Sequence, residues 1–252
     1  MAHEMIPSRA LRGLLYRKDN DGMTFHGFQK MTLLDFPGKV ACTLFTGGCN
    51  FRCPFCHNAG LVLNPGLGES YTVEEILAFL KKRQGLLDGV CITGGEPLLN
   101  PDLADFMREV RALGFLIKLD TNGSFPDRLQ DMVAEGLVDY VAMDIKNCPA
   151  KYPETVGISD YDVTPIRESV SFLLSGAVDF EFRTTVVREF HTVEDIQDIG
   201  AWIEGAPRYF LQNFVDSGAL IGQNLHSVGP DVLAQMQKSL VKYGIPVELR
   251  GL

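Results

Sequence analysis

The sequence predicts an α/β protein built on an incomplete barrel of parallel strands. Apolar runs of four to eight residues alternate with longer amphipathic stretches over most of the chain, the pattern of parallel strands joined by crossover helices. The alternation gives six strand–helix units followed by a final strand. A closed barrel of this kind has eight units, so we expect the sheet to remain open.

The individual elements follow from this alternation. Strands are expected at residues 40–46, 89–93, 116–120, 140–144, 180–187, 209–213 and 247–250. Amphipathic helices are expected near residues 73–83, 102–113, 126–135, 165–175, 193–203 and 230–243. Capping residues mark several helix starts: Thr72 precedes a first turn that contains Glu75, and Thr192 precedes one that contains Asp195.

The regular alternation predicts a single domain over residues 23–252. Residues 27–39 are expected to form a short hairpin or loop that ends in the turn residues Pro37 and Gly38. Residues 1–22 are mixed and polar, without a clear period, and are expected to form an N-terminal extension outside the core.

Composition narrows the class of protein. The 252 residues are 46% apolar and 22% charged, as in an ordinary globular protein. A net charge of −9 opposes general affinity for nucleic acid, which depends on Lys and Arg neutralising phosphates. The sequence has no apolar run of the ~18 residues that a membrane span needs, and its start lacks the apolar core of a signal peptide. We therefore expect a cytoplasmic protein with reduced thiols, no membrane contact, and a protein or small-molecule partner.

One loop carries most of the chemistry. Three of the six cysteines, Cys49, Cys53 and Cys56, follow the first expected strand with the spacing C-x3-C-x2-C. Thiolates this close together bind soft metal centres such as iron–sulfur clusters or zinc. A [4Fe-4S] cluster takes four ligands, so three cysteines would leave one iron open to a reactant.

Three other interpretations of this loop stay open. Residues 53–57 read C-x-x-C-H, the haem attachment pattern, which requires export from the cytoplasm. His57 could complete a Cys3His zinc site, although its place next to Cys56 would strain one tetrahedron. A disulfide framework is unnecessary in a chain long enough to bury its own core.

The cysteine loop, with Phe55 ahead of Cys56, resembles the signature of the radical S-adenosylmethionine (radical SAM) superfamily. Asp-Phe-Pro-Gly-Lys at residues 35–39 and Cys-His-Asn at residues 56–58 resemble, more narrowly, the glycyl-radical-enzyme activating enzymes. Among these, the activating proteins of anaerobic ribonucleoside-triphosphate reductase are most similar. The resemblance covers residues 23–251 and implies a partial (β/α)6 TIM-like barrel.

The resemblance implies an enzyme with a [4Fe-4S] cluster on Cys49, Cys53 and Cys56 and with S-adenosylmethionine at the open iron. One electron, from a donor such as flavodoxin or ferredoxin, would cleave S-adenosylmethionine to methionine and a 5'-deoxyadenosyl radical. That radical would take a hydrogen atom from a glycine of a partner, either anaerobic ribonucleoside-triphosphate reductase or pyruvate formate-lyase. Two other functions stay open: a radical SAM enzyme with a small-molecule substrate, and a non-catalytic metal-binding or electron-transfer module.

Unusual residues also follow the next three expected strands, at residues 93–97, 121–123 and 146–147. In barrels of βα units the loops after the strands meet on one rim, so we expect these segments beside the cysteine loop. By resemblance, Phe55 and the glycine motif belong to the S-adenosylmethionine site. The motif, formed by Gly94, Gly95 and Glu96, would bind the methionine ammonium.

The same resemblance implies a monovalent cation, Na+ or K+, bound by Asp120, Thr121 and Asp144, with the Met143 carbonyl as a weaker candidate. From the residues alone, helix capping by Asp120 or a structural ion pair between Asp144 and Lys146 is the alternative.

Two basic residues, Lys146 and Arg183, would neutralise the cofactor carboxylate or nearby substrate charge. Asp35 would lie near the substrate peptide, although it also suits a turn. Residues 211–214 read Leu-Gln-Asn-Phe where related activators have a histidine, so Gln212 and Asn213 are the candidates for the adenosine side.

Overall fold

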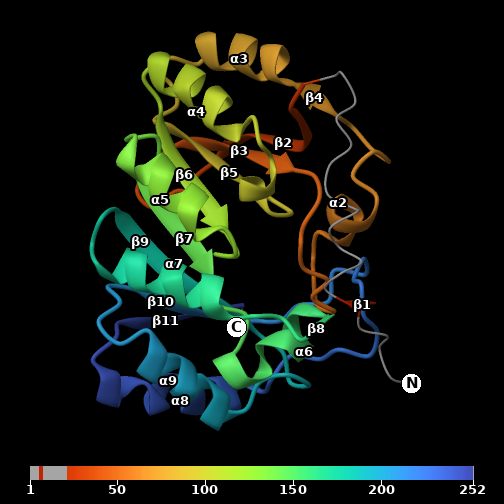
Figure 1. Ribbon diagram of the computed structural model, residues 1–252, viewed down its shortest axis with the longest axis vertical. Helices are drawn as coiled ribbons and strands as arrows, with labels where there is room; N and C mark the ends of the chain where they lie inside the picture. The colour runs from red at the N-terminus through yellow and green to blue at the C-terminus, as the bar shows by residue number, and fades with distance from the viewer. Residues whose placement is uncertain (1–5, 8–21, 252) are drawn as a thin grey trace.

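The computed structural model describes residues 6–7 and 22–251 and has the predicted α/β fold with an open, partial barrel (Figure 1). The predicted extension, residues 1–22, lies outside the described residues except for Ile6, Pro7 and Gly22. Strand β1 (Ile6–Pro7) pairs in parallel with β8 (Ile158–Ser159).

The main sheet has nine strands in the order β11-β10-β9-β7-β6-β5-β3-β2-β4. All neighbours from β3 to β11 are parallel. These parallel strands are β3 (Ala41–Thr46), β5 (Gly89–Gly94), β6 (Leu116–Thr121), β7 (Tyr140–Asp144), β9 (Asp179–Val186), β10 (Tyr209–Asn213) and β11 (Val247–Arg250). Each lies within one residue of its predicted bounds. Strands β11 and β4 end the order without pairing to each other, so the barrel is open.

Helices follow one another around the outer side of this sheet, from α3 at one end to α8 and α9 at the other (Figure 1). The predicted helices are α3 (Val73–Lys81), α4 (Leu103–Ala112), α5 (Pro126–Ala134), α7 (Thr164–Leu174), α8 (Val193–Trp202) and α9 (Pro230–Ser239). The end of the last predicted helix is a separate 3-10 turn, Val241–Tyr243. Sequence reasoning missed two five-residue helices, α2 (Ala59–Leu63) and α6 (Tyr152–Val156), and the 3-10 turns Pro97–Leu99 and Pro149–Lys151.

The segment predicted as a short hairpin or loop, residues 27–39, begins as the second half of a strand and ends in turns. Strand β2 (Thr24–Thr32) runs antiparallel to β3 and also pairs with β4 (Tyr71–Thr72). Its register against β3 shifts twice, between Phe25 and Gly27 and between Gln29 and Thr32. Such irregularities break the two-residue alternation by which a strand is recognised in a sequence.

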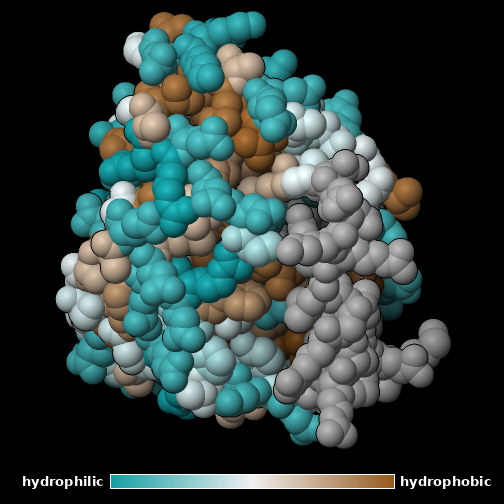
Figure 2. All heavy atoms as spheres, turned by 45° about the horizontal axis from the view of Figure 1, so that its top comes forward, coloured by the Kyte–Doolittle hydropathy of each residue, from teal (hydrophilic) through white to brown (hydrophobic). Residues whose placement is uncertain are grey.

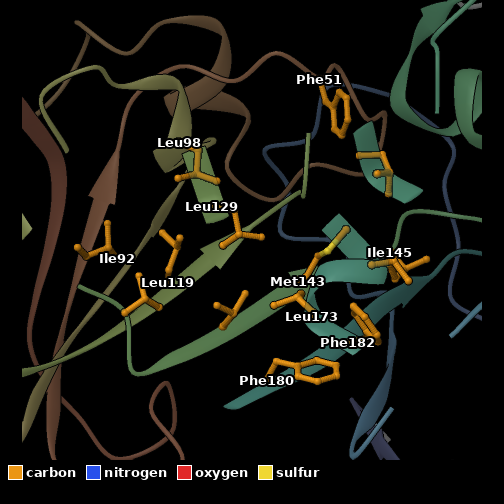
Figure 3. Close-up of a cluster of buried hydrophobic side chains, with 14 of the residues drawn as sticks. Phe51, Ile92, Leu98, Leu119, Leu129, Met143, Ile145, Leu173, Phe180 and Phe182 are labelled. Carbon is orange, nitrogen blue, oxygen red and sulfur yellow. The ribbon is translucent and has the colours of Figure 1, made fainter. Parts of the chain in front are cut away.

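The apolar core fills the space between the sheet and its helices. Ile92, Leu119 and Val141 are register neighbours on β5, β6 and β7, and all three are fully buried. Figure 3 shows Ile92 and Leu119 with Leu129 of α5 and Leu173 of α7. Because side chains alternate along a strand, the residues between these apolar ones face the barrel interior, where polar side chains gather.

Two predicted helix caps are confirmed. The Thr72 hydroxyl accepts a hydrogen bond from the Glu75 amide (3.3 Å), and the Glu75 carboxylate accepts one from the Thr72 amide (2.9 Å). Thr192 and Asp195 make the same reciprocal pair at the start of α8. Each box fixes the residue at which a helix begins.

Polar residues predominate on the face drawn in Figure 2, with apolar residues visible between them. None of the helices in the described part of the chain is both long and apolar enough to span a membrane.

Candidate functional site

The loops that follow β3, β5, β6 and β7 meet around one cavity of about 250 Å³. The predicted site residues that line it are Cys49, Cys53, Phe55, Cys56, Gly94, Gly95, Asp120, Thr121, Asp144, Lys146 and Arg183. Gln212 of β10 also lines this cavity. Strand-end loops converge here because the strands are parallel, which brings their carboxyl ends to one rim.

The cysteine loop is held in place by its own backbone and by neighbouring segments. The Gly48 amide donates to the Leu61 carbonyl (2.8 Å), and the Arg52 amide donates to the Val156 carbonyl (2.8 Å). The Arg52 guanidinium donates to the carbonyls of Cys49 (2.6 Å) and Phe51 (2.7 Å). The short helices α2 and α6 therefore act as supports for this loop.

The Cys53 thiol is buried, and those of Cys49 and Cys56 are partly buried. Burial raises the pKa of Cys49 and of Cys53 to about 12, and it also raises the pKa of Cys56. The Phe51 amide, which donates to Cys49 Sγ at 3.3 Å, favours the thiolate and opposes this effect. Metal binding would have to displace these protons, since thiolates are the form that binds.

The contacts of His57 argue against the Cys3His zinc interpretation. In the described part of the chain, no three or more His, Cys, Asp or Glu side chains are arranged to hold one metal ion. His57, the fourth ligand of the zinc interpretation, has its Nε2 2.7 Å from the Val215 carbonyl oxygen and its ring stacked on Phe214. Thiolates on a cubane bind different irons, so they need only line a common cavity, as these three do.

The glycine motif joins the end of β5 to the cysteine loop. The Gly95 amide donates to the Thr46 carbonyl (3.0 Å), and the Glu96 amide donates to the Gly48 carbonyl (2.9 Å). A Cβ on Gly95 would lie 1.8 Å from the Gly48 oxygen. Gly94 has a φ of +122°, and the Asn58 side chain donates to its carbonyl (2.8 Å). The approach of two backbones explains why this motif contains glycine.

Glu96 does not line the cavity; it lies behind the cavity wall. Its buried carboxylate accepts hydrogen bonds from the Thr121 hydroxyl (2.8 Å) and from the amides of Asn122 (2.7 Å) and Leu98 (3.0 Å). Burial raises its pKa to about 7, although these three donors favour the carboxylate. The residue therefore ties the β5 loop to the β6 loop.

Asp120 and Asp144 form a compact charge cluster with basic residues. Arg183 bridges them, with Nη1 3.1 Å from Asp120 Oδ2 and Nε 3.0 Å from Asp144 Oδ1. Lys146 Nζ lies 3.0 Å from Asp144 Oδ2, and Lys118 Nζ pairs with Asp120 Oδ1. The structural pair left open for Asp144 and Lys146 is therefore present. Asp120 lies within β6 and caps no helix.

These pairings determine the protonation states. Burial raises the pKa of Asp144, but the charges of Arg183 and Lys146 outweigh it and lower that pKa to about 2. Asp120 follows the same balance, with Arg183 and Lys118 keeping its pKa below the ordinary value. The pKa of Lys146 and that of Arg183 are raised because the aspartates outweigh the effect of burial. All four groups are charged near neutral pH.

Two predicted residues lie apart from the cavity lining. The Asp35 carboxylate accepts a hydrogen bond from the Thr43 hydroxyl (2.5 Å). The Asn213 side chain bonds to both the amide and the carbonyl of Val228 (3.1 Å each). Both contacts are structural.

Sequence reasoning assigned no individual role to two polar residues beside the site. Asn122 Nδ2 lies 3.8 Å from Cys49 Sγ and donates to Asn50 Oδ1 (2.9 Å). Lys118 carried a signal that was available in the sequence, because it interrupts an apolar strand two residues before Asp120 and so shares its face.

The fold and this cavity define the class of protein. The family model described as "Radical SAM superfamily" matches residues 43–201, and the chain belongs to this superfamily. Membership implies a [4Fe-4S] cluster and S-adenosylmethionine as cofactors. In the wider superfamily, the structure of Streptococcus suis SuiB bound to S-adenosylmethionine has a TM-score of 0.63 at 12% identity, covering 83% of this chain and 52% of SuiB.

Within the superfamily, the chain is an enzyme of the glycyl-radical-enzyme activating type. A protein of Methanocaldococcus jannaschii that is predicted to be such an activating enzyme is 34% identical over 75% of this chain and 78% of its own length. The pyruvate formate-lyase-activating enzyme of Clostridium pasteurianum is 32% identical over 48% of this chain and 52% of that enzyme. The corresponding Escherichia coli enzyme is 31% identical over 54% of this chain and 57% of its own length.

Solved structures support the fold. A radical SAM methyltransferase from Sphaerobacter thermophilus gives a TM-score of 0.69 at 14% identity, covering 87% of this chain and 68% of that one. A domain of a pyruvate-formate lyase-activating enzyme from Bacteroides vulgatus gives 0.53 at 18% identity, covering 65% of this chain and 99% of the domain.

Proposed function

We propose that this enzyme generates a glycyl radical on anaerobic ribonucleoside-triphosphate reductase. The observation that carries the proposal is the single cavity in which the three cysteines lie together with Asp144, Lys146 and Arg183. With both cofactors bound, one electron from a donor such as flavodoxin or ferredoxin would split S-adenosylmethionine into methionine and a 5'-deoxyadenosyl radical. That radical would take a hydrogen atom from the partner's glycine and become 5'-deoxyadenosine.

The residues divide this work between metal binding and orientation. Cys49, Cys53 and Cys56 would hold the cluster and leave one iron without a protein ligand. Lys146 and Arg183 present positive charge to the cavity wall, where they would bind the carboxylate of S-adenosylmethionine.

The remaining predicted cofactor residues would shape the same site. Gly94 and Gly95 line the cavity with backbone and would let the methionine ammonium approach closely. Phe55 packs against Phe190, with ring centroids 5.7 Å apart, and would form part of the wall of the cofactor pocket. We assign Glu96 a positioning role, because its carboxylate is occupied by Thr121, Asn122 and Leu98.

The choice of partner rests on sequence motifs and on the open barrel. Residues 35–39 and 56–58 resemble most closely the activating proteins of the anaerobic reductase. Pyruvate formate-lyase is the second candidate, because its activating enzymes from two organisms are similar to this chain. An incomplete barrel suits either partner, since a glycine loop of a large protein needs a side entrance. We place the reaction in the cytoplasm, where the free thiols found at all six cysteines would persist.

The test is anaerobic reconstitution with iron and sulfide, followed by reduction and chromatography for 5'-deoxyadenosine. We expect product from the wild type and none from Cys53→Ala. Addition of each candidate partner should then give a glycyl radical by electron paramagnetic resonance with one of them. A fully loaded, reducible cluster that yields neither product nor radical with either partner present would refute the proposal.

A further inference from the structure

Lys118 is a charged residue that the predicted site does not explain. It lies in the middle of β6, between Ile117 and Leu119, and its side chain is only 2% exposed. Its ammonium pairs with Asp120 Oδ1 and lies 3.8 Å from Cys91 Sγ. A buried ammonium is costly unless it is paired, so its position between two apolar residues of a buried strand suggests a specific role.

The residues expected to hold a monovalent cation are already engaged. Asp120 faces Lys118 with one carboxylate oxygen and Arg183 with the other. Asp144 faces Arg183 with one oxygen and Lys146 with the other. The Thr121 hydroxyl donates to Glu96 and accepts from the Gly123 amide (3.1 Å). This arrangement does not fit the cation site that family resemblance implies, because each expected side-chain oxygen already has a protein partner.

The charges of the ion-paired groups show what Lys118 contributes. Two carboxylates, Asp120 and Asp144, are joined by ion pairs to three cations, Lys118, Lys146 and Arg183, which gives these five groups a net charge of +1. Without Lys118 the sum would be zero. A bound Na+ or K+ would then be needed to restore the single positive charge that faces an anionic ligand.

We propose that Lys118 is a built-in replacement for the monovalent cation. Its ammonium supplies on Asp120 the positive charge that a bound Na+ or K+ would supply, so the cavity binds the carboxylate of S-adenosylmethionine without either ion. This inference rests on the proposed function for the identity of the ligand. Lys118 lies behind Asp120 and acts through it, which makes it a positioning residue.

The test compares the wild type with Lys118→Met, which keeps the length of the side chain and removes its charge. Lys151→Met is the matched control: Lys151 also pairs with an aspartate, Asp195 at 2.6 Å, but its side chain is 41% exposed and its partner, unlike Asp120, does not line the cavity. S-adenosylmethionine affinity is measured by calorimetry on the reconstituted proteins, in sodium, potassium or choline chloride of equal ionic strength.

We expect the wild type and Lys151→Met to bind equally, within about twofold, in all three salts. Lys118→Met should bind about tenfold more weakly in choline, because one paired charge shifts such an equilibrium by roughly this factor. Sodium or potassium should restore most of that loss. A wild type that requires sodium or potassium, or a Lys118→Met protein that binds normally in choline, would overturn the proposal. If Lys118→Met does not fold, Lys118→Gln takes its place in the same measurement. The comparison of the wild type in the three salts then still tests the proposal.

A second measurement needs no cofactor. The ²³Na resonance of sodium chloride should be broadened no more by the wild type than by Lys151→Met, and should be broadened further by Lys118→Met. Broadening by the wild type that Asp144→Asn abolishes would overturn the proposal, even if S-adenosylmethionine fails to bind. Failure of every variant to bind S-adenosylmethionine would instead refute the proposed function.

Discussion

Replacing Gly95 with alanine tests whether the glycine motif positions the cysteine loop. An alanine Cβ would lie 1.8 Å from the Gly48 carbonyl oxygen, whereas a comfortable C···O contact is about 3.3 Å. The end of β5 and the cysteine loop would therefore have to separate by about 1.5 Å. That movement would stretch the hydrogen bonds from Gly95 to Thr46 (3.0 Å) and from Glu96 to Gly48 (2.9 Å) beyond bonding range.

Loss of these two bonds gives the expected magnitude. A broken bond that leaves a buried group unsatisfied costs about 1–3 kcal/mol, so loss of two such bonds should lower the free energy of unfolding of Gly95→Ala by about 2–6 kcal/mol. A domain of ordinary stability would survive this loss, but its cysteine loop would be displaced. We expect iron content after reconstitution to fall well below that of the wild type.

The assays are denaturant unfolding of the metal-free protein and iron analysis of the reconstituted protein. Gly60→Ala is the control, because Gly60 lies in the nearby helix α2 and a Cβ there meets nothing within 4 Å. It should be neutral or stabilising by up to about 1 kcal/mol. The reasoning fails if Gly95→Ala unfolds within about 0.5 kcal/mol of the wild type and takes up as much iron.

Two further predictions concern stability. The pKa of Glu96 is raised from 4.5 to about 7 in the folded protein, so the folded state binds a proton that the unfolded state has lost. The free energy of unfolding, measured with denaturant, should therefore fall by about 3 kcal/mol as pH rises from 4.5 to above 7. Glu96→Gln should flatten this part of the pH profile, and an unchanged slope would contradict the assignment. Thr192→Ala removes the cap hydroxyl of α8 and should lower the free energy of unfolding by about 1 kcal/mol. Denaturant unfolding measures this loss, with Thr72→Ala at the equivalent cap of α3 for comparison. No loss in either variant would show that the caps do not stabilise these helices.

The sequence was sufficient for the parallel strands and their helices because burial on both sheet faces leaves apolar runs, such as residues 140–143, between amphipathic helices. The sequence was insufficient to predict elements that are irregular or very short. Strand β2 is antiparallel to its neighbours and carries two register shifts, and helices α2 and α6 have five residues each, too few for a helical period to appear.

The site was predictable in its membership but not in its contacts. Parallel strand order brings the loops after β3, β5, β6 and β7 to one rim, so the residue types at the strand ends were enough to find the cavity. The pairing of Arg183 with both Asp120 and Asp144 depends on strand register across β6, β7 and β9, which no local pattern specifies. The hydrogen bonds that Glu96 accepts from Thr121 and Asn122 were not predictable for the same reason, since these two partners belong to a different loop.

The cysteine loop is supported from two sides. On one side, Gly95 and Glu96 bind its start at Thr46 and Gly48. On the other, the segment after β10 crosses its end: the Gly222 amide donates to the Pro54 carbonyl (2.7 Å), and the Val215 carbonyl oxygen lies 2.7 Å from His57 Nε2. These contacts are made by the chain itself, so they reduce how much of the loop metal binding would have to order. A cluster would still have to displace the protons of the three thiols, whose pKa values are raised by burial.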